Sequence, residues 1–154
     1  MYKRQGQWTN AVKQLEAAIR LQGKHPEYHL ALGECKVQLL EFKDAILAFG
    51  TVVRLRQKNI SGWEALVRCL YLAEMYKEAL EQVQQAIRII GEKPLLTFYM
   101  SAIYFAMGKS KEGLIHLDKA LARSPKLLKK MIALNPSLLQ SQSIIDVIAR
   151  YRKR

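Results

Sequence analysis

The chain has 154 residues, 50% of them hydrophobic, with 25 Lys and Arg against 13 Asp and Glu. This length suits a single domain that buries most of its apolar surface. No apolar run approaches the roughly 18 residues that span a bilayer, and the opening Met-Tyr-Lys-Arg-Gln-Gly contains no apolar signal-peptide core. We therefore expect a soluble, cytoplasmic protein with no membrane partner.

The net charge of +12 is concentrated at the two ends of the chain. Basic and acidic residues balance over 26–118, eleven against eleven, whereas the first 25 residues carry +4 and the last 36 carry +8. This distribution favours a solvated surface or a docking patch over a continuous groove for phosphates.

Residues 1–25 predict one complete helix. Apolar residues at helical spacing indicate a helix from about Thr9 to Leu21, and Gly6 suits a break before it. Residues 2–5 would then be the remnant of an earlier helix. Because a helical hairpin needs both members to bury a face, we expect the chain to be a piece of a longer protein or to have a divergent first repeat.

Residues 26–127 repeat with a period of 34 and without a gap, as the units 26–59, 60–93 and 94–127. Each unit has two apolar stripes at helical spacing, and Pro26 suits the first turn of a helix. Small residues recur in phase in the second stripe, where they allow two helices to approach closely. They are Ala11, Ala45, Ala79 and Gly113, and again Ala18, Val52, Ala86 and Ala120.

The unit resembles the tetratricopeptide repeat (TPR), a helix–turn–helix with the pattern W-x2-L-G-x2-Y…A-x3-F…P. The matching residues are Trp63, Leu32-Gly33, Tyr2 and Tyr104, Ala11, Ala45 and Ala79, Phe49 and Pro125. The departures, which we expect to weaken individual packing contacts, are Val67 and Ser101 for the glycine, Gly113 for the alanine, and Gln57 and Gly91 for the proline. The resemblance covers about residues 1–127 and implies an all-α, right-handed superhelical solenoid of antiparallel helix hairpins.

The cysteines and histidines favour neither a redox site nor a metal site. Cys35 and Cys69 occupy equivalent positions of adjacent repeats, which usually lie farther apart than the roughly 7 Å between Cα atoms that a disulfide tolerates. We interpret both as small buried hydrophobic residues. His25, His29 and His116 lack partners at ligand spacing, so we expect no metal and no cofactor.

Residues 128–154 leave the pattern and are expected to cap the array. Ser124-Pro125 and Asn135-Pro136 each suit a helix start, and Ser143 to Asp146 resembles a capping box. A solenoid leaves an apolar face open at its end, and a terminal helix with a polar back usually closes it. Ile144, Ile145, Ile148 and Tyr151 would lie on that helix.

The resemblance implies a scaffold whose first helices line a concave groove for a peptide or a partner helix. The implied groove residues are Glu27, Leu30, Glu34, Val37 and Gln38, then Ser61, Glu64, Arg68 and Tyr71, then Leu95, Phe98, Ala102 and Phe105. The early positions are acidic and the later ones aromatic, which suits an amphipathic or aromatic-bearing segment with a basic end. The alternative is that the chain's own C-terminal helices cover Phe98 and Phe105. Because Arg68 is the only cation among these groove residues, we do not expect the Lys and Asn clamp with which some TPR proteins hold a C-terminal carboxylate.

Other functions have weaker sequence support. Lys126, Lys129, Lys130 and residues 150–154 could contact nucleic acid or an acidic partner, but a solvated tail is the simpler explanation of them. The half repeat at the N-terminus could pair with a copy of itself. We expect no enzyme, because the sequence has no glycine-rich phosphate loop, carboxylate pair or nucleophile motif.

Overall fold

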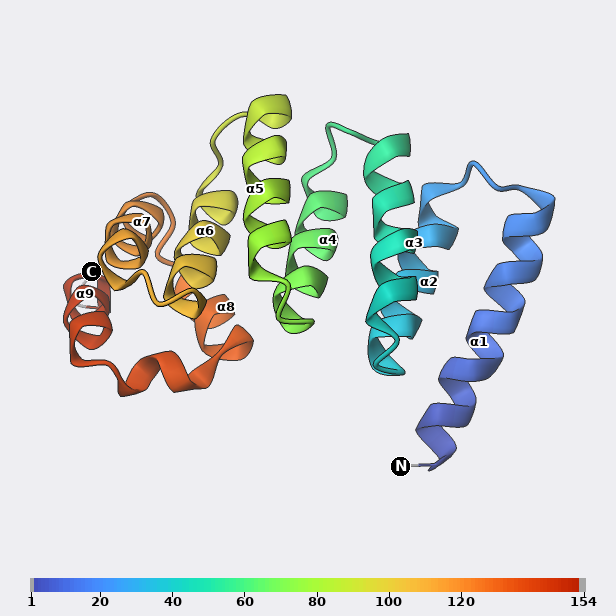
Figure 1. Cartoon of the computed structure of the whole chain (residues 1–154), viewed down its shortest axis with the longest axis horizontal. Coiled ribbons are helices and arrows are strands. Elements are labelled where there is room, and N and C mark those ends of the chain that lie inside the picture. The colour runs from blue at the N-terminus through green and yellow to red at the C-terminus, as the bar shows by residue number, and fades with distance from the viewer. Residues whose placement is uncertain (1, 153–154) are drawn as a thin grey trace. The chain divides into compact units, whose positions relative to one another are not determined.

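The computed structural model describes the backbone of residues 2–152 and the side chains of residues 4–152. Within these residues the chain is built from helices joined by short turns (Figure 1). The helices are α1 (Tyr2–Leu21), α2 (Pro26–Gln38), α3 (Phe42–Leu55), α4 (Ile60–Leu72), α5 (Tyr76–Ile90), α6 (Pro94–Ala106), α7 (Ser110–Arg123), α8 (Leu127–Leu134), the 3-10 helix η1 (Pro136–Gln140) and α9 (Gln142–Arg152). No helix in this part of the chain is long and apolar enough to cross a membrane.

The chain forms two compact units, residues 1–82 and 83–154, and the boundary between them falls within α5. Unit 1 contains α1 to α4 and the start of α5. Unit 2 contains the end of α5 and all later helices, so residues 128–154 belong to the same unit as the last hairpin.

The helix boundaries repeat with the period of the sequence. Every start recurs after 34 residues: Pro26, Ile60 and Pro94 open the first helices of the repeats, and Phe42, Tyr76 and Ser110 open the second. The predicted all-α repeat of helical hairpins is therefore confirmed.

The turn inside each hairpin recurs as well, at a residue with positive φ. Leu40 (φ 60°), Glu74 (φ 61°) and Gly108 (φ 79°) all lie in the left-handed region. In the first turn the N–H of Glu41 donates to the carbonyl of Lys36 at 2.8 Å, the bond that defines a Schellman motif at the end of a helix. Only glycine adopts this conformation without a steric cost, so Leu40 and Glu74 are strained.

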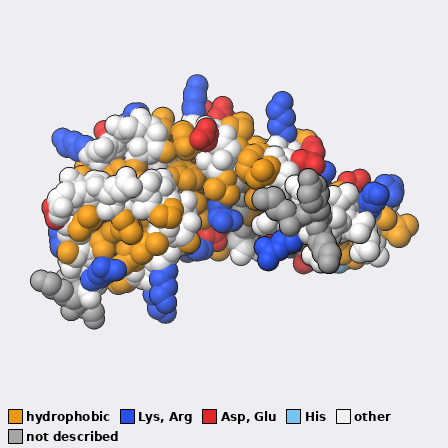
Figure 2. Space-filling model, turned by 90° about the horizontal axis from the view of Figure 1, so that it is seen from below, with side chains coloured by type: hydrophobic (Ala, Val, Ile, Leu, Met, Phe, Trp, Pro, Cys, Tyr) orange, Lys and Arg blue, Asp and Glu red, His pale blue; other side chains and the backbone are white. Residues whose placement is uncertain are grey.

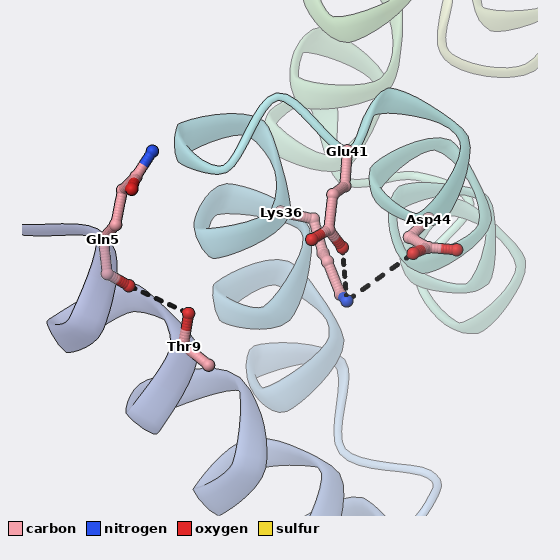
Figure 3. A network of polar contacts seen from close by, with 5 residues as sticks. All are labelled: Gln5, Thr9, Lys36, Glu41 and Asp44. Carbon is pink, nitrogen blue, oxygen red and sulfur yellow. Dashed lines mark hydrogen bonds and ion pairs between the residues drawn. The ribbon is translucent and has the colours of Figure 1, made fainter. Parts of the chain in front are cut away.

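Charged side chains reinforce the first of these turns (Figure 3). Lys36 Nζ lies 2.8 Å from Glu41 and 3.5 Å from Asp44, so it joins α2, the turn and the start of α3. The hydrogen bond to Glu41 raises the pKa of the Lys36 ammonium group. In the same view the Thr9 hydroxyl donates to the backbone carbonyl of Gln5 at 2.9 Å, within α1.

Helix α1 runs through Gly6, so the predicted break at this residue is wrong. Residues 2–5 form the first turn of α1 and are not the remnant of a separate helix. An exposed glycine costs a helix only about 1 kcal/mol relative to alanine, and α1 packs against α2, which helps to offset that cost. Tyr2 lies in α1, but its side chain, which matches the repeat's tyrosine, is outside the described residues.

Small residues bring the helices of unit 1 close together, as the sequence predicts. A Cβ atom on Gly33 would lie 2.4 Å from the ring of Phe49, so this ring packs directly on the backbone of α2. A Cβ on Gly62 of α4 would meet Val52 of α3 at 2.9 Å. Trp63 is buried, and its indole N–H donates to the carbonyl of Gln57 at 2.7 Å.

In unit 2, α8 and α9 pack on the last hairpin. Helix α8 contacts α6 and α7, and α9 contacts α7. The Tyr151 hydroxyl donates to the carboxylate of Asp118, and Arg150 Nη1 lies 3.4 Å from the same carboxylate. The apolar side of α9 is buried, at Ile144, Val147 and Ile148.

Two predicted helix starts in this segment are wrong. Helix α8 begins at Leu127, because Pro125 and Lys126 form a turn that follows Ser124. Ser143 to Asp146 is not a capping box, since α9 already begins at Gln142. Instead, the side-chain amide of Gln142 donates to the carboxylate of Asp146 at 2.9 Å within the helix.

The start predicted at Asn135-Pro136 is confirmed, although the helix that follows is the short η1. The side chain of Asn135 accepts a hydrogen bond from the N–H of Ser137 at 3.2 Å. Lys153 and Arg154, the end of the predicted basic tail, lie outside the described residues.

We expect Leu40→Gly to stabilise unit 1 by about 0.5–1 kcal/mol, because relief of the left-handed conformation exceeds the entropy that glycine loses on folding. Leu40 is 74% exposed, so little packing is lost. Urea denaturation followed by circular dichroism measures the change. The matched control is Gly108→Ala, which places a side chain at φ 79° and should be destabilising. A loss of stability in Leu40→Gly would show that the turn is not strained.

Cys35 and Cys69 are free and buried. Burial raises the pKa of both thiols, that of Cys69 from 9.0 to about 11. Because the thiolate is the reactive form, we expect a thiol reagent to label the native chain slowly and the chain in guanidinium quickly, near neutral pH. Since the folded pKa of Cys69 lies above the unfolded one, its contribution to stability is complete below pH 9.0 and is lost as the pH rises to about 11. Rapid labelling of either thiol in native buffer would contradict this.

Candidate protein-binding surface

The first helices of the first two full repeats, α2 and α4, pack side by side within unit 1. Glu27, Leu30, Glu34 and Val37, the first four predicted groove residues of α2, follow one another at spacings of three or four, and Gln38 lies four residues after Glu34, so they share one face of the helix. Leu30 and Val37 are half-buried on this face, and Glu27, Glu34 and Gln38 are exposed beside them. The structure therefore offers a narrow aliphatic strip flanked by two carboxylates.

The carboxylate of Glu27 stays ionised to lower pH than usual. Hydrogen bonds from its own backbone N–H and from the ring of His25, 3.2 Å away, hold the pKa of Glu27 below its ordinary value. The group is fully exposed, so this charge is available to a ligand in solution but is screened by salt.

Helix α4 carries one acidic and one basic side chain at the groove positions that the resemblance implied. Glu64 is half-buried and Arg68, one turn later, is exposed. Ser61 is exposed at the first turn, where its N–H donates to the Asn59 side chain at 2.9 Å. Tyr71 is only 6% exposed. We call the surface formed by Glu27, Leu30, Glu34, Val37, Gln38, Glu64 and Arg68 the α2/α4 surface.

Tyr71 belongs to the interior of its hairpin. Its ring lies edge-on to that of Tyr76, with the ring centroids 5.6 Å apart. Burial, with smaller effects from Glu74 and Tyr71, raises the pKa of the Tyr76 phenol. The pair is a packing contact between the two helices of the repeat.

Two of the positions predicted for the groove in unit 2 are buried and not offered to a ligand. Phe98 and Ala102 are buried, at 0% and 1% exposure, and α6 packs against both α7 and α8. Leu95 is half-buried. The burial of Phe98 agrees with the alternative that the chain itself covers it, so this side chain is left out of the proposed surface.

A depression that the sequence did not indicate lies at the loop before α2. Its volume is about 510 Å³, and it is lined by Lys24, His25, Pro26 and Arg56 among other residues. Its basic side chains lie next to the start of the acidic α2/α4 surface. Within the described part of the chain, no group of three or more His, Cys, Asp or Glu could hold a metal ion.

Three solved structures are similar to the chain over most of its length. A crystal structure of MamA covers 96% of this chain and 88% of its own, with a TM-score of 0.72 at 14% identity. TTC0263, a thermophilic TPR protein in Thermus thermophilus, covers 87% and 74%, with a TM-score of 0.67 at 18% identity. YrrB, described as a TPR protein with an unusual peptide-binding site, covers 89% and 74%, with a TM-score of 0.61 at 15% identity. The chain has a TPR fold. No family model and no curated protein matches the sequence.

One departure from the TPR pattern is explained by the packing of Phe105. A Cβ atom on Gly113 would lie 2.6 Å from the Phe105 ring, so the ring occupies the space of the usual alanine side chain. Two periods of 34 residues earlier, in the first full repeat, the equivalent pair is Val37 and Ala45. The first helix of that repeat carries a smaller side chain than Phe105, and its second helix carries a larger one than Gly113. The sequence suggested that Gly113 would weaken the contact between α6 and α7. The ring of Phe105 fills the space beside Gly113, so the glycine does not weaken this contact. Phe105 is half-buried as a packing residue.

We expect Gly113→Ala alone to destabilise unit 2 by about 1–3 kcal/mol, since the new methyl group overlaps the ring of Phe105. Phe105→Val should also destabilise, because it leaves a cavity. The double variant restores the volumes of the first repeat's pair, so it should be more stable than the sum of the single changes by about 1 kcal/mol or more. Chemical denaturation of the four proteins measures this coupling. Strict additivity would show that the two residues do not share one space.

Proposed function

We propose that the chain is a non-catalytic protein-interaction scaffold that holds a basic amphipathic segment of another protein on the α2/α4 surface. The observation that carries this proposal is the composition of that face: two half-buried aliphatic residues among three carboxylates, with one cation. Half-buried Leu30 and Val37 provide apolar contact, and Glu27, Glu34 and Glu64 favour positive charge beside it.

The accessible residues change the expected ligand. With Tyr71 and Phe98 inside the protein, the surface does not offer the aromatic pockets that would suit an aromatic-bearing peptide. An amphipathic helix with aliphatic anchors and flanking Lys or Arg fits better, because charge complementarity raises the rate and selectivity of association. The fold is that of TPR proteins, and YrrB, which has the same fold, has a peptide-binding site; this likeness supports the class of function.

Nucleic-acid binding through the C-terminal segment has less support. Arg150 of this segment is paired with Asp118 at 3.4 Å. Self-association through α1 stays a hypothesis, and the molecular mass in solution at high protein concentration tests it.

Glu34→Lys tests the α2/α4 surface, because it reverses an exposed charge at the middle of that face. Peptides selected from a random display library against the whole chain serve as ligands, and fluorescence anisotropy measures their affinity. We expect binding of the basic amphipathic peptides to weaken about tenfold in the variant, and its dependence on salt to decrease.

The matched control is Glu81→Lys, the same change at an exposed position of α5 in unit 1. It should leave the affinity unchanged. The proposal is wrong if both variants bind equally well, or if the selected peptides carry no excess of basic residues.

A further inference from the structure

Two large apolar side chains of the terminal segment are exposed. The end of a helical solenoid normally presents a polar outer face, and the sequence predicted a polar back for the last helix. Within this surface Leu139 is 36% exposed and Ile145 is 39% exposed. Figure 2 shows hydrophobic side chains gathered over the segment that Figure 1 labels α8 and α9. The other exposed residues of α9 are mostly polar, at Gln142, Ser143, Asp146, Arg150 and Arg152.

A hollow of about 290 Å³ opens between α8, η1 and α9. Helices α8 and α9 both contact η1, which joins them within unit 2. Leu128 and Ile132, one turn apart, line the hollow from α8, and Ile145 and Ala149, again one turn apart, line it from α9. Leu139 of η1 also lines it. We call this site the terminal hollow.

Helix α9 is fixed on the side away from the terminal hollow. Ile144 and Val147 are buried, and Tyr151 is hydrogen-bonded to Asp118 of α7. The residues one position later, Ile145 and Ile148, face the hollow together with Ala149. Helix α9 therefore has apolar side chains on two sides: on the side of the hollow Ile148 is buried, whereas Ile145 is 39% exposed.

The size of the terminal hollow suits side chains more than a whole cofactor. Sites for cofactors and drug-sized ligands are clefts of about 300–1,000 Å³ that enclose most of the ligand, and this hollow lies at the lower limit of that range. Aliphatic anchors of a helix, spaced three or four residues apart, fill grooves of this kind.

The charge around the hollow indicates the sign of the partner. Among the described residues of the lining, Arg152 is the only charged one, and it is exposed. Residues 127–152 contain four basic residues, Lys129, Lys130, Arg150 and Arg152, against the single acidic Asp146. We propose that the terminal hollow binds an acidic amphipathic helix of a partner protein, with aliphatic side chains in the hollow and a carboxylate on Arg152. This site goes beyond the α2/α4 surface, lies in the other unit and prefers the opposite charge.

The experiment selects ligands with the whole chain. A display library of random peptides about 16 residues long, or roughly four helical turns, is selected on the wild-type chain and depleted on Ile145→Ser. We expect the enriched peptides to have aliphatic residues on one helical face and a net negative charge. Their affinity should fall about tenfold in both Ile145→Ser and Leu139→Ser. Leu47→Ser, at another exposed leucine, should bind as the wild type does, and circular dichroism confirms that each variant is folded.

A charge exchange separates specific docking from simple hydrophobic adhesion. Arg152→Glu should lower the affinity for the acidic peptide about tenfold. A version of the peptide with Lys in place of its acidic residues should bind the Arg152→Glu protein more tightly than it binds the wild-type protein. The proposal is overturned if no enriched peptide depends on Ile145, or if acidic and basic versions bind alike. It is also overturned if vesicles of anionic lipid bind through Ile145 and peptides do not, or if Ile145→Ser abolishes self-association of the chain in place of peptide binding.

Discussion

The close approach of paired helices at glycine is the constraint on which the hairpins depend. In the first full repeat the ring of Phe49 lies on Gly33, and in the third the ring of Phe105 lies on Gly113. The aromatic residue belongs to the second helix in one case and to the first helix in the other. Interiors are packed to the density of crystals. Where the ring of one helix lies against the backbone of its neighbour, that neighbour therefore has a glycine at the point of contact.

This packing decides which side chains remain for binding. A large residue at the position of Phe105 is needed to fill the space above Gly113, and Phe98 and Tyr71 are likewise buried. On α2 the smaller Leu30 and Val37 leave room for exposed carboxylates beside them. The surface that results in unit 1 is acidic and aliphatic, because the aromatic residues serve the interior.

The two proposed surfaces select partners by opposite charge. Carboxylates surround the aliphatic strip of the α2/α4 surface, whereas Arg152 borders the terminal hollow. Charge complementarity contributes more to the rejection of wrong partners, through repulsion between like charges, than to the affinity for the correct partner. A scaffold with one surface of each kind, each on its own unit, could hold two different proteins without competition for one site.

The sequence by itself determined the repeat. Its period of 34 predicted the helix starts at Pro26, Ile60 and Pro94, because amphipathic spacing and proline at a first turn are local properties of the chain. Glu27, Glu34 and Arg68, which the resemblance to the TPR implied for the groove, are exposed on first helices. Only the tertiary structure decided the rest. The helix through Gly6, the buried state of Phe98 and the exchange of volume between Phe105 and Gly113 depend on residues that are distant in sequence or on another helix. The terminal hollow depends in the same way on three short elements and on the hydrogen bond from Tyr151 to Asp118. A linear pattern of apolar residues predicts a helix with apolar faces, but it does not determine which of those faces a neighbouring helix covers.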